Sequence, residues 1–266
     1  MAFHFHKDRD IYIRQQKANA AEFLIPFIEE ALPIVEGMHV MEIGCGEGGV
    51  LKAFLDRGCQ GVGIELLKGK AERARDTLKS EISSGQAIVM NKNIYDIDVA
   101  ADFSSLFDLI ILKDVIEHIH DQDAILSRLR NFLKPGGHIF FGFPPWQMPF
   151  GGHQQVLAHR LLSRTPYFHL LPVPFYRGIL KAFGETPVSI QNTLEIKETG
   201  ISIERFERLV RKNHFSVILR TYYLFNPIYK YKFNLTPRVQ FGLLTRIPYF
   251  RNFVTTCMYY LVQKEA

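Results

Sequence analysis

The sequence lacks several features that would place it in particular classes of protein. No apolar run reaches the roughly 18 residues that a transmembrane helix needs. The first ten residues, MAFHFHKDRD, are polar or charged where a secretory signal needs an apolar core. Cys45, Cys59 and Cys257 are an odd number without C-x-x-C spacing, so we predict neither a disulfide framework nor a metal site built on cysteine. We therefore expect a soluble, cytoplasmic protein with reduced thiols.

Charge and aromatic residues are distributed unevenly along the 266 residues. Residues 1–150 contain 16 Lys and Arg against 21 Asp and Glu, whereas residues 151–266 contain 16 against 6 and hold 19 aromatic residues. One interpretation is a solvated basic surface over an aromatic core. The other is an apolar pocket with a basic rim, suited to an amphipathic anionic acceptor or to peripheral contact with a membrane.

Short apolar runs alternate with amphipathic segments up to Pro144, which predicts strands alternating with helices. Because the strands are apolar almost throughout, we expect a doubly wound α/β domain with a mostly parallel sheet, and ligands beyond the carboxyl ends of its strands. The expected strands are Val40–Ile43, Gly61–Glu65, Ala87–Asn93, Phe107–Asp114 and His138–Pro144. The expected helices are Arg14–Leu32 with a kink at Pro26, Gly49–Arg57, Lys70–Leu78 and a helix from the N-cap Asp121 to Leu133, which KPGG then ends.

The alternation breaks after Pro144. Residues 150–200 form an aromatic-rich stretch with helical pieces, which we interpret as an inserted substrate region within a single domain spanning residues 1–266. Regular patterns return with an amphipathic helix, Ile201–Asn213, and two β-rich runs, FSVILRTYYLF and FVTTCMYYLVQK. We expect Asn226–Arg251, between those two runs, to fold outward as an excursion.

The stretch VMEIGCGEGG contains G-x-G-x-x-G at Gly44, Gly46 and Gly49, between an expected strand and an expected helix. Glycines there let the backbone approach a ligand closely. Glu65 follows 21 residues after Gly44, where a carboxylate can accept both hydroxyls of an adenosine ribose. This arrangement suits a nicotinamide dinucleotide as well as any other adenosine cofactor, and Glu65 could also be an ordinary solvated carboxylate.

Further motifs separate these cofactors. Glu42 would repel a pyrophosphate but can support the cationic methionine part of S-adenosyl-L-methionine. With KDVIEHI and LKPGGHIFF, the order E-x-G-C-G, second-strand acid, F-D-x-I, E-H and L-K-P-G-G resembles the class I S-adenosylmethionine-dependent methyltransferases over about residues 40–144. The resemblance implies a Rossmann-like, mostly parallel sheet of seven strands. It also implies a methyltransferase.

The resemblance implies which residues hold the cofactor. Glu65 would bind the ribose, Leu66 would pack on the adenine, Asn93 stands where the family has an acid for the adenine amino group, and Ile94 would cover the ring. Lys113 would offer its backbone carbonyl to the amino group of the methionine part. The methionine end would thus be surrounded by Glu42, Gly44, Cys45, Gly46, Lys113 and Asp114.

Two segments are candidates for catalysis, although an in-line methyl transfer depends mainly on positioning. Asp114, Glu117 and His118 form D-x-x-E-H, similar to the E-x-x-E-H by which ubiquinone-pathway O-methyltransferases are thought to place a divalent metal beside a catechol-like acceptor. The alternative is that Glu117 and His118 are the family's common E-H pair, which orients the loop and the following helix. His118 is therefore a catalytic candidate without an assigned metal.

His153 is the second catalytic candidate. It follows Gly151 and Gly152 in PPWQMPFGGHQQ, which we interpret as a hinged pocket wall with His153 as base or hydrogen-bond donor to the acceptor. A surface loop with an exposed histidine is the alternative. His159 and Arg160 on the next helical piece could serve the same pocket.

The leading hypothesis is methyl transfer from S-adenosyl-L-methionine to a small or lipid-like acceptor, with oxygen as one candidate atom. An NAD(P)-dependent oxidoreductase is the second hypothesis, but an irregular region stands where the second dinucleotide-binding half should follow. A non-catalytic membrane-surface adaptor is the third. Nucleic acid ranks below these partners because we find no base-reading motif and no Asn-Pro-Pro-aromatic motif. No pattern indicates an oligomeric state.

Overall fold

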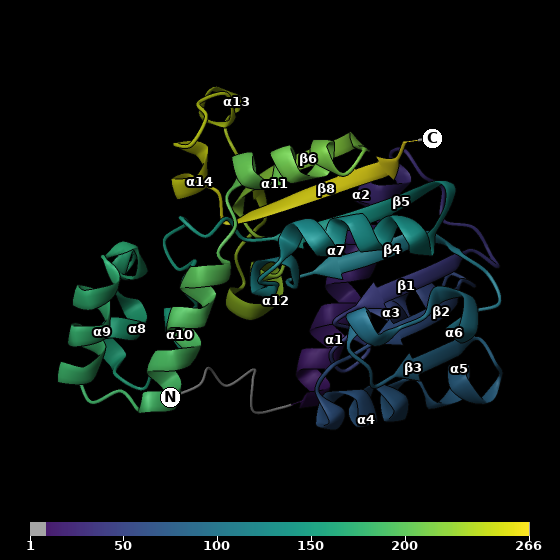
Figure 1. The fold of residues 1–266 in the computed structure, drawn as a ribbon, viewed down its shortest axis with the longest axis horizontal. Coiled ribbons are helices and arrows are strands. Elements are labelled where there is room, and N and C mark those ends of the chain that lie inside the picture. The colour runs from purple at the N-terminus through teal and green to yellow at the C-terminus, as the bar shows by residue number, and fades with distance from the viewer. Residues whose placement is uncertain (1–8, 266) are drawn as a thin grey trace.

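One sheet of eight strands runs through the part of the chain that the structure describes, residues 9–265 (Figure 1). In this computed structural model the strand order is β3-β2-β1-β4-β5-β8-β6-β7. Strands β1 to β5 are parallel, and β8 pairs antiparallel with both β5 and β6. The strands are β1 (His39–Ile43), β2 (Gln60–Ile64), β3 (Ala87–Met90), β4 (Phe107–Lys113), β5 (Leu133–Phe143), β6 (Phe215–Phe225), β7 (Arg238–Val239) and β8 (Cys257–Lys264).

The sheet differs from the expectation in two places. The prediction of seven strands was short by β7, a two-residue strand that pairs with β6 and lies inside the segment expected to fold outward. The prediction that KPGG precedes the fifth strand was also wrong, because β5 already pairs at Leu133 with Phe107 before the register shifts. Gly136 has a φ of 71° within that irregular start, a backbone region that suits glycine.

Helices cover both faces of the sheet, because the strand side chains alternate between two apolar clusters. In β4, Leu109 and Ile111 join the cluster with α2, α3 and α4, whereas Ile110 and Leu112 join the one with α7 and α11. Asp121 caps α7 by accepting from the backbone N–H of Ala124, as predicted. The helices are α1 (Arg9–Asn19), α2 (Ile25–Glu29), α3 (Gly49–Leu55), α4 (Lys68–Thr77), α5 (Lys79–Ser83), α6 (Val99–Asp102), α7 (Gln122–Leu129) and α11 (Ile203–Lys212).

The N-terminal helix begins before the predicted Arg14, and its path contains a π-helical turn, Ala20–Leu24, between α1 and α2. Pro26 lies in the first turn of α2, where its missing N–H and its ring disturb the regular bonding of the preceding turn. The predicted irregularity at Pro26 is thus a change of helix type. α1 then packs against α3 at the carboxyl edge of the sheet.

Three helices form the insertion after β5, and they stand beside the sheet in Figure 1: α8 (Arg160–Arg164), α9 (Val173–Ala182) and α10 (Pro187–Thr199). They share a small apolar core of their own, which includes Tyr176 and Leu194. α10 was not predicted, because its apolar residues show almost no helical periodicity. At the end of α10, the hydroxyl of Thr199 donates to the backbone carbonyl of Glu117, and this bond joins the insertion to the segment after β4.

The segment between β6 and β8 contains α12 (Tyr229–Phe233), α13 (Gly242–Thr245) and α14 (Arg251–Val254). The expectation that all of it folds outward was wrong for α12, which packs beside α1. There Gln15 donates to the carbonyl of Tyr231 at 3.0 Å, and Glu22 pairs with Lys230 and accepts from the Tyr231 hydroxyl. Between residues 9 and 265, no helix has the length and apolar character needed to cross a membrane.

Candidate active site

A glycine turn follows β1 and leads into α3 at the carboxyl edge of the sheet. Gly44 and Gly46 have φ angles of 68° and 56°, in a backbone region that residues other than glycine disfavour. A Cβ atom on Gly44 would lie 2.6 Å from Cγ2 of Val115, whereas a Cβ atom on Gly46 would meet nothing within 4 Å. Gly46 therefore presents its backbone to open space, as a ligand cradle requires.

A cavity of about 130 Å³ opens at this turn. One wall is α1, which contributes Tyr12, Ile13 and Gln16. None of the three was predicted: Tyr12 and Ile13 precede the predicted start of the helix, and no local pattern shows that Gln16 faces the glycine turn. The opposite walls come from the ends of β1 and β4. The structure brings together around this cavity the predicted residues Glu42, Gly44, Cys45, Gly46, Lys113 and Asp114.

Glu42 is a buried acid beside the glycine turn. Its side chain is 3% exposed, and its Oε2 accepts the backbone N–H of Leu51 at 2.9 Å. Burial raises the pKa of Glu42 to about 8, against the lowering effects of that hydrogen bond and of Lys113. A carboxyl group that is desolvated to this degree is stabilised in its ionised form by a cationic ligand, which fits a sulfonium or ammonium group in the cavity.

Cys45 contributes its backbone to the same cavity. Its thiol is buried, and its Sγ lies 2.8 Å from the position that a Cβ atom on Gly63 would take. Burial, followed by the charges of Glu42 and Glu65, raises the pKa of the Cys45 thiol. The thiol therefore stays protonated at neutral pH and is a packing group.

Glu65 lies outside the lining of this cavity and is hydrogen-bonded to the backbone. Its Oε2 accepts from the N–H of Gly46 at 2.9 Å, and its Oε1 accepts from the N–H of Leu67 at 2.8 Å. The carboxylate thus connects the glycine turn to the start of α4, and each oxygen keeps a further lone pair for a ligand hydroxyl. Leu66 beside it is 64% exposed, so it presents an uncovered apolar surface.

Asn93 and Ile94 follow β3 and have structural contacts of their own. The Asn93 side chain accepts from the N–H of Tyr95 and caps the short turn Ile94–Asp96. Ile94 is buried in the apolar cluster on the α7 face. Neither residue lines the cavity at the glycine turn, and their predicted contacts with the adenine stay predictions.

Lys113 and Asp114 form an ion pair at the end of β4, with Nζ and Oδ2 2.5 Å apart. Burial alone would lower the pKa of Lys113, but the charge and hydrogen bond of Asp114 raise it. Burial would likewise raise the pKa of Asp114, but Lys113, followed by Lys232 and His153, lowers it. The sequence analysis assigned Lys113 only a backbone role, whereas its ammonium group is held beside the cavity.

Glu117, His118 and His153 form a compact cluster beyond this pair. One ligand atom from each residue lies within 4.8 Å of the others, and the two imidazole rings are edge to face with centroids 5.1 Å apart. Glu117 is 4% exposed, and among the described residues neither of its carboxylate oxygens has a hydrogen-bond partner. Burial, followed by the charge of Asp114, raises the pKa of Glu117. These three side chains could hold a divalent cation.

His153 lies in this cluster and is partly buried, so the alternative of an exposed histidine on a surface loop was wrong. Burial, followed by the charge of His118, lowers the pKa of His153 to about 4, so its imidazole is neutral at neutral pH. The expected hinge at Gly151 and Gly152 stays a prediction, but both positions have a packing reason to be glycine. A Cβ atom on Gly151 would lie 2.0 Å from the carbonyl oxygen of Trp146, and one on Gly152 would lie 2.3 Å from Cβ of His169. Close packing holds His153 in place.

His159 and Arg160 do not join the cluster. His159 packs edge to face on Phe183 with ring centroids 4.7 Å apart, within the helical insertion. His169 anchors that insertion instead, because its Nε2–H donates to the carbonyl of Trp146 at 2.7 Å. Burial lowers the pKa of His169 to about 4, which keeps the ring neutral.

α12 adds a positive charge to the same region. Burial lowers the pKa of Lys232, and the charge of Asp114 opposes that shift. The site therefore combines a cavity at a backbone turn with a polar group of residues drawn from the end of β4, the segment after β5 and α12. A doubly wound sheet with such a turn and cavity at its carboxyl edge defines a nucleotide-dependent enzyme fold.

The comparisons identify the family. Residues 13–184 match the family model described as a methyltransferase domain, so the chain belongs to the S-adenosylmethionine-dependent methyltransferases. S-adenosyl-L-methionine is the cofactor of this family, and the nicotinamide alternative is set aside. Among solved structures, the magnesium protoporphyrin IX methyltransferase of Synechocystis shares 12% identity with a TM-score of 0.55, covering 97% of this chain and 86% of that one. Identity at this level shows the fold alone.

Curated relatives match over a shorter stretch. The ubiquinone biosynthesis O-methyltransferase of Leptothrix cholodnii is 30% identical over 115 residues, which is 43% of this chain and 47% of that protein. The protein of the same name from Coxiella burnetii is 26% identical over 148 residues, which is 56% of this chain and 58% of that protein. The chain thus spans about half the length of the curated relatives it matches.

Proposed function

We propose that this protein transfers a methyl group from S-adenosyl-L-methionine to a hydroxyl oxygen of an amphipathic small molecule, with a phenol or catechol as the reacting part. The observation that carries this proposal is the cluster of Glu117, His118 and His153 beside the Lys113–Asp114 pair, at the edge of the cavity. The name of the curated relatives, ubiquinone biosynthesis O-methyltransferase, supports a ring hydroxyl as the acceptor.

The chain's own residues divide the task between two ends of the site. The bound cofactor supplies an electrophilic methyl group. Gly46 and the other residues of the glycine turn hold its methionine part, Glu42 balances its positive charge, and Glu65 accepts its ribose hydroxyls. Leu66 and Ile94 hold the adenine, with Asn93 facing its amino group. At the other end, the helical insertion and α12 enclose the acceptor and exclude water.

His153 acts on the acceptor hydroxyl. Its neutral ring offers a lone pair, and the neighbouring carboxylate of Asp114 favours the protonated imidazole that forms when the hydroxyl loses its proton. His118 lies edge to face with His153 and orients it. Both roles need the ring to stay where Gly151 and Gly152 hold it.

A cation at the cluster is a second candidate role for the same residues. Glu117, His118 and His153 are a carboxylate and two imidazoles within 4.8 Å of one another, and the unpaired oxygens of buried Glu117 favour a positive partner. A divalent ion held there would supply positive charge that lowers the pKa of an acceptor hydroxyl.

The first experiment is calorimetric titration with S-adenosylmethionine, S-adenosylhomocysteine and NADH, followed by transfer of labelled methyl to a 4-alkylcatechol, with its dimethyl ether as control. We expect the two sulfur nucleotides alone to bind, and the free catechol alone to be methylated. Cofactor binding without transfer to the catechol would refute the proposed acceptor class.

Replacement of His153 by alanine tests its role. His153→Ala should lower turnover by about 10²–10⁴-fold while leaving cofactor affinity unchanged, which is the usual range for a general base. The matched control is His120→Ala, because the His120 side chain is 62% exposed. Equal turnover in the two variants would remove His153 from the chemistry.

Chelation separates the two roles. If His153 acts as a base, treatment with EDTA leaves turnover unchanged. If the cluster holds a cation, EDTA abolishes turnover, added Mg²⁺ restores it, and Glu117→Gln loses that restoration.

A further inference from the structure

The segment that follows α12 ends in an exposed apolar tip, residues 238–250, which comprises β7, α13 and the chain leading to α14. Figure 1 shows α13 at the outer limit of the molecule, away from the helical insertion and from the strands β1 to β4. Leu243 is 75% exposed and Phe241 is 64% exposed. The exposed large apolar side chains of the tip are Val239, Phe241, Leu243, Ile247, Tyr249 and Phe250.

Along the chain, the residues on both sides of this tip carry charges of one sign. Residues 208–264 contain no Asp or Glu and ten Lys or Arg. Within the tip, Arg238 and Arg246 are both exposed. A surface that combines uncovered aromatic and aliphatic side chains with arginine, without any acid, is complementary to an anionic interface.

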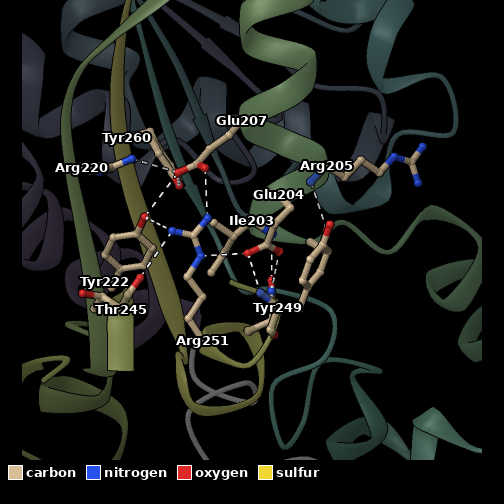
Figure 2. Close-up of polar contacts among 12 residues, drawn as sticks. Ile203, Glu204, Arg205, Glu207, Arg220, Tyr222, Thr245, Tyr249, Arg251 and Tyr260 are labelled. Atoms are coloured by element: carbon tan, nitrogen blue, oxygen red, sulfur yellow. Dashed lines mark hydrogen bonds and ion pairs between the residues drawn. The ribbon is translucent and has the colours of Figure 1, made fainter. Parts of the chain in front are cut away.

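The base of the tip is fixed by a partly buried polar network around Arg251 (Figure 2). The guanidinium of Arg251 donates to Glu204 at 2.8 Å, to Glu207 at 3.0 Å and to the hydroxyl of Tyr222 at 2.9 Å. Glu204 also accepts from the backbone N–H of Tyr249 at 2.9 Å.

The network has two consequences for the tip. It compensates the two acids nearest to the tip, so they add little negative charge there. It also ties the C-terminal end of the tip to α11, through the backbone N–H of Tyr249 and the carboxylate of Glu204.

We infer that residues 238–250 dock on an anionic lipid surface. Phe241, Leu243 and Ile247 enter the acyl region, while Arg238 and Arg246 contact acidic headgroups. A protein partner would need a defined groove or a longer regular element to pair with, whereas the tip offers exposed apolar side chains around a four-residue helix. This inference goes beyond the proposed methyl transfer and does not depend on it, because docking requires neither cofactor nor acceptor.

Sedimentation with lipid vesicles tests the inference on the full-length protein. The vesicles are phosphatidylcholine alone, or phosphatidylcholine with roughly one third phosphatidylglycerol to give an anionic surface. We expect binding to the phosphatidylglycerol vesicles, weaker binding to phosphatidylcholine alone, and weaker binding again as salt increases.

Variants locate the contact. The triple change Phe241→Ser, Leu243→Ser and Ile247→Ser should weaken binding by more than about tenfold, since each apolar side chain that enters the acyl region contributes. Arg238→Gln with Arg246→Gln should weaken binding to anionic vesicles only. The matched control is Ile88→Ser, because Ile88 is 55% exposed on β3, at the opposite edge of the sheet from β7.

Several results would overturn the inference. Absence of wild-type binding to either vesicle would leave the tip as a surface for another macromolecule. Triple-variant binding equal to wild type would move the contact elsewhere, and equal loss in Ile88→Ser would make it non-specific. Equal wild-type binding to both vesicles would remove the anionic preference. Unchanged affinity of every variant for S-adenosylmethionine shows that the fold is intact and keeps these results separate from any failure of the proposed methyl transfer.

Discussion

The two ends of the candidate site are built in different ways. The cofactor end is made largely of backbone from adjacent parallel strands, with Gly44, Gly46 and Glu65 within one short stretch of sequence. The proposed acceptor end is made of side chains from segments that lie far apart in the sequence, among them His118, His153 and Lys232. A backbone turn depends on local residues, whereas a side-chain cluster depends on how every connecting segment packs. Changes at each end should therefore have separable effects.

Replacement of Arg251 should have the largest effect. Arg251→Met removes a partly buried cation from between Glu204 and Glu207, and the two partly buried acids that it leaves uncompensated cost about 1–3 kcal/mol of unfolding free energy. We expect a much lower melting temperature, with little change in affinity for S-adenosylmethionine below the transition. Arg220→Met is the control, because the Arg220 side chain is 53% exposed and pairs with Glu207 from the outside of the network. A parallel loss of cofactor affinity would show that this network and the cofactor end are coupled.

Glu65 tests the cofactor end. Glu65→Ala should weaken cofactor binding by about 2.5–3 kcal/mol, roughly a hundredfold in Kd, because two ribose hydroxyls lose a charged acceptor. Circular dichroism should show an intact fold. Glu72→Ala, at a side chain that is 56% exposed, is the control. Retained affinity in the Glu65 variant, measured by calorimetry, would mean that the ribose is held elsewhere.

His169, which anchors the helical insertion, makes the stability of the protein depend on pH. Its pKa is about 4 in the folded protein against an ordinary 6.5, so between these values the unfolded chain binds a proton that the folded chain does not. Stability therefore falls as pH drops through this window, and His169 contributes about 2 kcal/mol of that loss between pH 7 and pH 4.5.

The ring of His169 contacts Trp146 and Gln154, and the ammonium group of Lys197 binds the His169 carbonyl. None of these groups carries a negative charge that would stabilise the protonated ring, and the charge of Lys197 opposes it. Denaturant titrations of His169→Gln should show a shallower pH dependence than the wild type, because that proton is no longer taken up on unfolding. An identical slope in the two proteins would contradict the assignment.

Leu66 should give the smallest effect. Leu66→Ser should weaken cofactor binding by about 0.5–1 kcal/mol, a few-fold in Kd, because only part of an apolar side chain would be covered by the adenine. Its neighbour Leu67 is 56% exposed, so Leu67→Ser is a closely matched control that should leave Kd unchanged. Equal changes in Kd for the two variants would contradict a specific contact between the adenine and Leu66.

The cofactor half was the more predictable part of the fold. Its strands were expected within a few residues of their observed bounds, and the N-cap at Asp121 was confirmed. These predictions succeeded because apolar periodicity, glycine and capping residues act over a few neighbours. The eighth strand was missed because β7 has two residues, too few to produce a periodic signal. α10 was missed because its buried residues include the polar Thr193 and Thr199 beside Ile190 and Leu194, so the sequence shows no single apolar face.

The sequence by itself determined the parallel sheet, the glycine turn, the acid at the end of β2 and the methyltransferase family, since each of these rests on residues close together in the chain. Only the tertiary structure decided that α1 forms a wall of the cavity, that His153 meets Glu117 and His118, and that α12 folds back while the apolar tip projects. Those features depend on contacts between distant segments. Such contacts are selected by the packing free energy of the whole molecule, so no local pattern encodes them.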